Sequence, residues 1–585
     1  MAKSPPGEDR VIRVALSQLN CVVGDIDGNV EKIRRSLVRA REVGADLALF
    51  PELTVTGYPP EDLLLKPHFA ERAEAALRDL AAEVRDVVAV VGFPELCDDL
   101  FNTAAVITGG QIAAVYRKHY LPNYGVFDEQ RYFARGDETL VLDMDGVRVG
   151  VTICEDLWYP GGPAQRAVVD GKADVLVSIS ASPYHREKGP SREQMLATRC
   201  IDYGCYLAFC NAVGGQDELV FDGHSLVVDP RGVILARGRQ FEEDDVVVDL
   251  DLSGVSRRRL HDPRWRQRGP GDAAIVREAA VRRPRRTKPE LDVCLPVELL
   301  GPEAEVYRAL VLGTSDYFVK NGFEHAVLGL SGGIDSALAL AVAVDALGPD
   351  AVTAVSMPSR YTAPLNREDA VETARRFGVE FREIPIDGVF GCYVAALEES
   401  FAGTEANVAE ENIQARIRGN LLMALSNKFG WLVLATGNKS EMSVGYATLY
   451  GDMAGGFSII KDVSKTWVYR LSRWRNRENE VIPQRIIDKP PSAELREGQL
   501  DSDTLPPYDI LDPIVAAYVE EDRNPEEIEK LGFDRALVYQ VVDLIDRAEY
   551  KRRQAAPGIR ISPRAFGKDR RLPITNRYRP GPRAD

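Results

Sequence analysis

The sequence predicts an α/β protein with two domains, and three observations support this interpretation. The chain has 585 residues, which is more than one domain of ordinary size contains. Short β-branched runs alternate with amphipathic helical runs in both halves. Between the halves, residues 255–290 hold twelve basic and four acidic residues with few apolar ones, a composition typical of a linker or surface strap. We therefore expect domains at residues 11–250 and 300–585, joined by a basic linker at 251–299.

The first domain combines short strands with charged helices. Because both types recur along the domain, we expect helices layered on a mixed sheet. The expected helices cover residues 29–45 and 70–86, and the expected strands cover residues 11–19, 46–50, 87–93, 147–154, 174–180, 206–213 and 223–230.

The second domain repeats a strand, helix, strand order. Single helices between strands predict right-handed crossovers and a parallel, Rossmann-like sheet. The expected helices cover residues 305–322, 337–348, 367–378 and 419–430, and the expected strands cover residues 326–330, 351–358 and 431–436. Residues 488–512 are polar and rich in proline, which is typical of a long loop that covers an active site.

Composition excludes several classes of function. With 73 Lys and Arg against 89 Asp and Glu, the net charge is −16, which argues against non-specific nucleic-acid binding. The N-terminus lacks an apolar signal region, and no run approaches the roughly 18 apolar residues of a membrane helix. The eight cysteines form no Cys-x-x-Cys pair, and the six histidines form no cluster. We expect a reduced, cytoplasmic protein without a zinc site, in which oxygen-ligated magnesium remains possible.

A glycine-rich loop follows the expected strand at 326–330. In the string Ser331-Gly332-Gly333-Ile334-Asp335-Ser336, the glycines let backbone N–H groups approach an anion, and the next helix adds its dipole. The loop lacks the lysine that ends a Walker loop. A plain strand-to-helix turn is the structural alternative, but the position and Asp335 favour a phosphate site.

This loop resembles the pyrophosphate loop of the N-type ATP pyrophosphatases, which implies cleavage of ATP between its α- and β-phosphates. The resemblance implies ATP contacts from Gly329, Leu330, Ser331, Gly332, Gly333, Ile334, Asp335, Ser336 and Thr436.

Further strings in this half narrow the resemblance. The string ATGNKSE begins at Ala435, NIQARIRGN lies upstream of it and PPSAEL downstream. Together they resemble the NAD synthetases, which amidate deamido-NAD with ATP. Carried over from that family, Asn412, Glu441 and Lys568 would contact deamido-NAD, and Asp335 with Glu441 would bind Mg²⁺. Lys568 lies in a basic C-terminal stretch, Lys551–Arg583, with Asp569 as its one acid; a solvated tail is the alternative for that stretch.

Three residues of the first domain have complementary chemistry at expected strand ends. Cys154 ends the strand at 147–154, Glu52 follows the strand at 46–50, and Lys118 ends the run QIAAVYRKHY. A lone cysteine is usually an inert buried residue. Here a carboxylate could take the thiol proton while the lysine stabilises a thiolate or an oxyanion.

These strings resemble the Glu-Lys-Cys triad of the nitrilase superfamily over residues 11–250. The resemblance implies an α-β-β-α sandwich, catalytic roles for Glu52, Lys118 and Cys154, and an orienting role for Glu129. Glutamine would be bound by Tyr124, Ser182 and Lys188, although Arg186 could replace Lys188.

Both halves together resemble the family of glutamine-dependent NAD synthetases, which are carbon-nitrogen ligases. The implied substrates are L-glutamine, ATP and deamido-NAD, with Mg²⁺ as the cofactor. We expect a homo-oligomer, and a tunnel that carries ammonia between the sites. Two alternatives remain: a tRNA-modifying pyrophosphatase-loop enzyme fused to an amidase, and an N-terminal half that is only an oligomerisation scaffold. The net charge argues against the first, and the intact triad argues against the second.

Overall fold

The computed structural model describes residues 10–266, 276–284, 286, 288–291 and 296–578. The chain divides into two compact units: residues 1–216 with 220–300, and residues 217–219 with 301–585. Within the described residues, no helix is both long and apolar enough to cross a bilayer.

The N-terminal unit contains two mixed sheets, where the residue pattern predicts one mixed sheet and the nitrilase resemblance implies two. One sheet has the order β14 (Asp244–Asp251), β1 (Val11–Gln18), β2 (Leu47–Leu49), β3 (Val88–Leu96), β4 (Leu100–Thr108) and β5 (Gln111–Arg117). The other has the order β13 (Ile234–Arg237), β12 (Leu226–Val228), β9 (Tyr206–Asn211), β8 (Val175–Ser180), β7 (Val147–Ile153), β6 (Thr139–Met144) and β15 (Val276–Ala280). A hairpin of β10 (Val213–Gln216) and β11 (Leu219–Asp222) follows β9.

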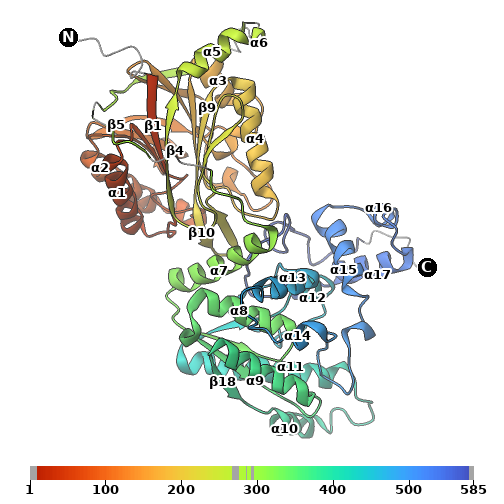
Figure 1. Cartoon of the computed structure of the whole chain (residues 1–585). Helices are drawn as coiled ribbons and strands as arrows, with labels where there is room; N and C mark the ends of the chain where they lie inside the picture. Colours follow the sequence, from red (N-terminus) through yellow and green to blue (C-terminus); the bar gives the residue numbers. More distant parts are fainter. Residues whose placement is uncertain (1–9, 267–275, 285, 287, 292–295, 579–585) are drawn as a thin grey trace, which may run out of the picture. The chain divides into compact units, whose positions relative to one another are not determined.

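The two sheets pack face to face between outer helices (Figure 1). Alternate residues of the strands, such as Val149 and Val151 of β7, fill the core between the sheets. The helices α1 (Ile26–Glu42) and α2 (Pro67–Glu83) bury apolar faces against the first sheet, and α3 (Gly162–Val169) and α4 (Lys188–Tyr203) do so against the second. This arrangement confirms the α-β-β-α sandwich.

The segment expected as a basic linker contributes to this unit. It contains α5 (Ser253–His261), α6 (Pro263–Arg266) and β15, and β15 pairs in parallel with β6 at the edge of the second sheet. Main-chain pairing does not depend on apolar side chains, so the charged composition of this segment gave no sign of the strand.

The C-terminal unit has one parallel sheet, which confirms the Rossmann-like prediction. Its order is β18 (Glu380–Glu383), β17 (Val352–Ser356), β16 (Ala326–Gly329), β19 (Leu432–Ala435) and β20 (Phe457–Ser458). The apolar run after Ser336 forms α8 (Ile334–Leu347), which is buried on nearly all sides. The other helices before the C-terminal subdomain are α7 (Pro302–Asn321), α9 (Pro364–Phe377), α10 (Asp387–Leu397), α11 (Val408–Phe429), α12 (Lys439–Val444), α13 (Lys465–Arg475) and α14 (Gln484–Asp488).

A helical subdomain follows the sheet in the chain. It packs a separate apolar core from Leu505, Leu511, Val538 and Ile545, among others. Its helices are α15 (Tyr508–Val515), a π-helical turn η7 (Ala516–Glu520), α16 (Pro525–Glu529), α17 (Arg535–Arg547) and α18 (Glu549–Arg552). Because the core includes Val444 of α12, this subdomain is packed directly against α12, the helix that follows β19.

Candidate active sites

The predicted triad residues lie at the ends of three strands of the N-terminal unit. Glu52 follows β2, Lys118 follows β5, and Cys154 follows β7, so both sheets contribute. The Lys118 Nζ atom lies 2.6 Å from Glu52 Oε1 and 2.8 Å from Glu129 Oε2. All four side chains are buried, so these ion pairs are poorly screened by water. The structure therefore brings together all four residues that the sequence assigns to catalysis.

Glu52 is fixed by two further donors that the sequence analysis missed. The Asn102 side-chain amide donates to Glu52 Oε1 at 2.7 Å, and the backbone N–H of Ala181 donates to Oε2 at 3.0 Å. Asn102 lies on β4 and Ala181 follows β8, so only the folded sheets bring them to Glu52. The carboxylate is thereby held in one orientation, as a general base requires.

Cys154 has a strained backbone at a sharp turn. Its φ angle is +43°, in the left-handed region that is uncommon for residues with a side chain. Burial, reinforced by the charge of Glu52, raises the pKa of the thiol well above its usual range, against the opposing effect of Lys118. The resting group is therefore a thiol near a carboxylate and an ammonium group, a combination that suits proton transfer from a nucleophile to a carboxylate base.

Asp156 ties the cysteine turn to the lysine strand. One of its carboxylate oxygens accepts the backbone N–H of His119 at 3.2 Å and of Tyr120 at 3.0 Å. The other accepts the N–H of Ile153 at 3.1 Å and the Tyr116 hydroxyl at 2.7 Å. One buried carboxylate thus fixes the residues next to both Lys118 and Cys154.

Glu129 shares Lys118 with Glu52. Burial raises the pKa of Glu129 to about 7, against the opposing charge of Lys118. The Tyr58 hydroxyl donates to Glu129 Oε1 at 2.9 Å. Glu129 is thus a second carboxylate in contact with the lysine, and its own position is fixed by Tyr58.

Two of the residues predicted to bind glutamine, Tyr124 and Lys188, lie against the segment that follows Cys154. The Tyr124 hydroxyl donates to Glu155, the neighbour of Cys154, at 2.9 Å. The Lys188 ammonium lies 6.0 Å from the centre of the Trp158 ring and donates to the Pro183 carbonyl at 2.9 Å. Glu155, the partner of Tyr124, is not among the residues that the sequence predicts for this site.

A second site lies in the C-terminal unit, at the carboxyl ends of the parallel strands, where such sheets bind ligands. A cavity of about 300 Å³ is lined by the glycine-rich loop after β16, by the ends of β17 and β19, and by the proline-rich segment 489–495. Gly332 has a φ angle of +79°, and a Cβ atom there would lie 2.1 Å from the Asn366 carbonyl oxygen. Only glycine fits this position, because a side chain there would collide with the backbone of Asn366.

Most of the predicted ATP-binding residues line this cavity. They are Gly329, Leu330, Ser331, Gly333, Ile334, Asp335, Ser336 and Thr436. Among the described residues around the cavity, Gly332, Asn412 and Lys568 are not lining residues. Asn412 lies one contact away, because its side-chain oxygen accepts from the hydroxyl of Thr448, a lining residue, at 2.7 Å.

Lys465, which the sequence analysis missed, lies between the two predicted metal ligands. Its Nζ atom is 2.5 Å from Asp335 Oδ2 and 3.4 Å from Glu441 Oε1. Burial raises the pKa of Glu441 to about 8, with help from Asp335 and against the charge of Lys465. Lys465 begins α13, far along the chain from either acid, and no motif pointed to it.

The carboxylates suit a magnesium ion that is also held by phosphate. Among the described residues, no group of three or more His, Cys, Asp or Glu side chains could bind a metal by itself. Magnesium, however, commonly takes only one or two carboxylates and completes its shell with substrate phosphates and water. Asp335 and Glu441, both lining the cavity next to the glycine-rich loop, offer that donor set.

Comparisons with known proteins agree with both sites. The carbon-nitrogen hydrolase family matches residues 13–259, and the NAD synthase family matches residues 306–555. The chain is 50% identical to the glutamine-dependent NAD(+) synthetase of Thermotoga maritima, over 97% of this chain and 99% of that protein. For the corresponding protein of Aquifex aeolicus, the identity is 48%, over 97% and 100% of the two chains.

A solved structure extends this similarity to the fold of the whole chain. The glutamine-dependent NAD+ synthetase of Acinetobacter baumannii, in complex with ADP, is 42% identical, with a TM-score of 0.74 over 97% of this chain and 99% of that one. The similarity covers both units. The chain therefore belongs to the glutamine-dependent NAD synthetase family.

Proposed function

We propose that the chain converts deamido-NAD, ATP and L-glutamine to NAD, AMP, pyrophosphate and L-glutamate. The observation that carries this proposal is the presence, in one chain, of a buried Glu-Lys-Cys triad and a phosphate-loop cavity. The full-length similarity to glutamine-dependent NAD synthetases supports it. The two sites have complementary reactions: the first releases ammonia, and the second activates a carboxylate that ammonia can attack.

In the N-terminal unit, Cys154 would attack the carboxamide carbon of glutamine while Glu52 takes the thiol proton. The Lys118 ammonium would stabilise the negative charge that develops on the carbonyl oxygen. The carbon-nitrogen bond then breaks, Glu52 returns the proton to the leaving nitrogen, and ammonia departs from a γ-glutamyl thioester. Glu52 would next take a proton from water, which attacks the thioester and releases glutamate and the thiol.

In the C-terminal unit, a carboxylate oxygen of the nicotinate ring would attack the α-phosphorus of ATP. The bond to pyrophosphate breaks, and an acyl-adenylate forms. Backbone N–H groups and hydroxyls of the loop 331–336 would bind the phosphates. Ammonia then attacks the acyl carbon and displaces AMP.

Asp335 and Glu441 would hold magnesium together with the ATP phosphates, and the ion would neutralise charge on the departing pyrophosphate. Lys465, placed between these carboxylates, would compensate their charge before ATP and the metal bind. Once the magnesium ion is present, the ammonium group of Lys465 could turn toward a phosphate oxygen within the same cavity.

We further propose that ammonia passes between the sites without mixing with the solvent. Ammonia is mostly protonated at neutral pH, and ammonium has no lone pair with which to attack the adenylate. Isotope-labelled ammonium in the solution should therefore not enter the NAD that is made from unlabelled glutamine. Extensive label in the product at low ammonium concentration would contradict this part of the proposal.

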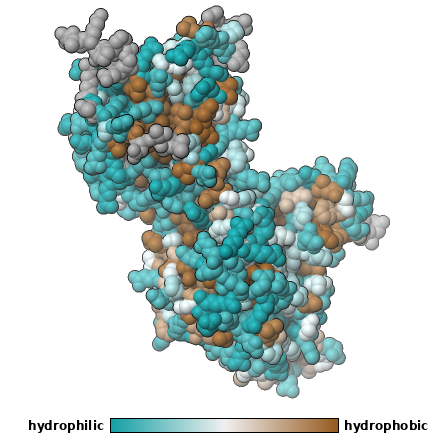
Figure 2. Space-filling model, viewed as in Figure 1, coloured by the Kyte–Doolittle hydropathy of each residue, from teal (hydrophilic) through white to brown (hydrophobic). Residues whose placement is uncertain are grey.

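We also propose a cytoplasmic homo-oligomer. The sparse cysteines without a Cys-x-x-Cys pair support the compartment. Apolar surface gathers on the visible face of the N-terminal unit, while most of the remaining visible surface is hydrophilic (Figure 2). A patch of this kind favours association between protein surfaces. Light scattering of the purified chain would give the number of subunits.

The substrate assignment can be tested by measuring AMP release from ATP. Deamido-NAD should stimulate AMP release, with one NAD formed per AMP, when either glutamine or ammonium supplies nitrogen. Unmodified tRNA should not stimulate it. AMP release that depends on tRNA and ignores deamido-NAD would overturn the proposal and favour the tRNA-modifying alternative.

A further inference from the structure

Lys439 is a buried lysine that the reaction above does not use. It begins α12, two residues before Glu441, and is only 2% exposed. Its Nζ atom lies 2.6 Å from Glu520 Oε1 and 3.0 Å from Asp462 Oδ1. Among the described residues, it is not one of those that line the ATP cavity. A lysine buried between two carboxylates costs desolvation energy and needs a reason.

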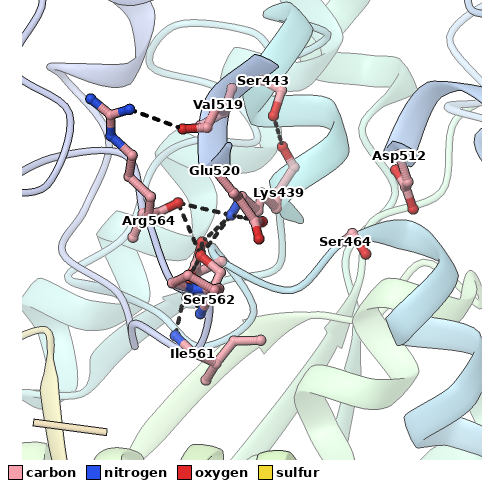
Figure 3. Close-up of polar contacts among 12 residues, drawn as sticks. Lys439, Ser443, Ser464, Asp512, Val519, Glu520, Ile561, Ser562 and Arg564 are labelled. Carbon is pink, nitrogen blue, oxygen red and sulfur yellow. Dashed lines mark hydrogen bonds and ion pairs between the residues drawn. The ribbon is translucent and has the colours of Figure 1, made fainter. Parts of the chain in front are cut away.

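The remaining contacts of this ammonium group are with residues 556–578, here called the C-terminal segment. Lys439 Nζ donates to Ser562 Oγ at 2.6 Å and to the Arg564 carbonyl at 3.1 Å (Figure 3). Asp462 Oδ2, on the same side, accepts the backbone N–H groups of Ile561 at 2.8 Å and Ser562 at 2.7 Å. Lys439 and Asp462 thus hold the C-terminal segment at one place.

The C-terminal segment has internal hydrogen bonds, so the contacts made by Lys439 and Asp462 position more of the segment than the residues they touch. Asp569 Oδ2 accepts from Arg560 Nε at 2.5 Å and from the Ala565 N–H at 3.0 Å. These bonds close the segment into a compact loop between residues 560 and 569. Lys568, the predicted deamido-NAD contact, lies in this loop, and its position follows from where Ser562 is held.

The residue before Lys439 connects α12 to the phosphate loop. The side-chain oxygen of Asn438 accepts the Glu441 N–H at 3.0 Å, and its amide donates to Asp335 Oδ1 at 2.8 Å. Two consecutive residues therefore bind different parts of the unit. Asn438 binds the acid that begins α8, and Lys439 binds the C-terminal segment.

We propose that Lys439 is a positioning residue of the amidation site: it holds the C-terminal segment against α12 and so sets where Lys568 lies relative to Glu441 and the phosphate loop. The inference rests on the proposed function, because it assumes that the C-terminal segment contributes to binding deamido-NAD. Lys439 itself touches no substrate. Its role is exerted through Ser562 and the carbonyl of Arg564.

The test uses the full chain with Lys439→Met, which keeps the length of the side chain and removes its charge. Loss of charged hydrogen bonds should speed hydrogen exchange at the Ile561 and Ser562 amides about tenfold or more. The KM for deamido-NAD should rise about tenfold or more, with a smaller change in the KM for ATP, when ammonium is the nitrogen donor. Glutamine hydrolysis in the N-terminal unit should stay unchanged.

Two further variants separate positioning from general loss of stability. Ser562→Ala removes one acceptor on the C-terminal segment without emptying the site, and it should change both readouts in the same direction by less. Lys320→Met is the matched control, because Lys320 is a largely buried lysine whose carboxylate partner, Asp316, lies on its own helix. This control should leave exchange at residues 561–562 and the KM for deamido-NAD as in the wild type.

Unchanged exchange at Ile561 and Ser562 in Lys439→Met would overturn the inference, as would faster exchange with an unaltered KM for deamido-NAD in both variants. Equal effects of Lys439→Met on the KM values of ATP and deamido-NAD would also contradict it, because they would indicate general loosening of the unit. Failure of the proposed function would look different, since the wild type itself would then release no AMP with deamido-NAD.

Discussion

Arg192 provides a stringent test of how the glutamine site is supported. It lies on α4, is 0% exposed, and forms two bonds with Asp222, at 2.6 and 3.1 Å. Asp222 Oδ1 also accepts from the Asn211 amide at 3.3 Å. Asn211 in turn accepts the backbone N–H of Ser182 at 2.8 Å. The ion pair therefore supports the turn after β8 that carries a predicted glutamine contact.

The same turn reaches the catalytic base. Ala181, the residue before Ser182, donates its N–H to Glu52 at 3.0 Å. A shift of Asn211 would move this donor and loosen Glu52, although Arg192 touches neither the thiol nor the substrate. We expect Arg192→Met to lower the rate of glutamine-driven NAD synthesis and to leave ammonium-driven synthesis near its wild-type rate.

The magnitude follows from burial. Removing one partner of a buried ion pair leaves the other charge uncompensated and costs about 3–5 kcal/mol. In the wild type, burial acts to raise the pKa of Asp222, but Arg192 and His224 outweigh it and hold the pKa far below its usual range. A carboxylate with a lowered pKa stabilises the fold above its unfolded pKa of about 4, and this contribution is lost as pH falls through the folded pKa.

Arg192→Met should reverse that shift, so that protonation of Asp222 relieves the buried charge. The difference in unfolding free energy between wild type and variant should therefore be largest near neutral pH. It should narrow as the pH falls toward about 4. Urea unfolding at several pH values, with hydrogen exchange in the strands of the N-terminal unit as the readout, measures this difference in unfolding free energy.

Arg231→Met is the matched control in the same unit. Arg231 pairs with Asp229 at 2.8 Å, but its side chain is 70% exposed, and exposed pairs contribute about 0–1 kcal/mol. If Arg192→Met costs no more than Arg231→Met, the buried pair does not stabilise the unit as argued. If it costs the expected amount but glutamine-driven synthesis is unchanged, the path through Asn211 to Glu52 is refuted.

Three other substitutions test the sites directly. Cys154→Ser should abolish glutamine-driven NAD synthesis and spare ammonium-driven synthesis; steady-state rates with each nitrogen donor would show this, and retained glutamine use would contradict the assigned nucleophile. Glu129→Gln should become more stable relative to the wild type as the pH rises from about 4.5 to 7. The reason is that the pKa of Glu129 is raised in the fold, so its ionisation destabilises the wild type. Urea unfolding measures this, and a difference in unfolding free energy that stays constant across the range would contradict it. Lys465→Met should lower the rate of AMP formation about a hundredfold or more with either nitrogen donor, because it leaves two carboxylates facing ATP without a nearby cation. Glutamine hydrolysis should persist in this variant. Equal loss of AMP formation and glutamine hydrolysis would indicate misfolding instead.

The sequence predicted those parts of the fold and sites that depend on local pattern. Period-two and helical patterns predicted helices layered on a mixed sheet in the first domain and a parallel sheet in the second. The two-sheet sandwich was implied by the resemblance to the nitrilase superfamily, and strand ends pointed to Glu52, Lys118 and Cys154. These residues could be found because each lies within three residues of the end of an apolar strand. The supporting residues could not, because their partners are distant in the chain. Asn102 and Ala181 meet Glu52 only once both sheets have formed, because β4 is separated from β2 by β3 in one sheet and β8 belongs to the other.

A buried lysine between two carboxylates occurs three times in the described chain, and only one case could be predicted. Lys118 was predicted because it ends a strand. Lys465 and Lys439 begin short helices after loops, and in a sequence such a lysine resembles an ordinary solvated residue. What distinguishes them is burial together with two acids brought from other segments. Only the tertiary structure brings these acids to the lysine. Replacing any of the three lysines should therefore destabilise its site more than replacing a solvated lysine would.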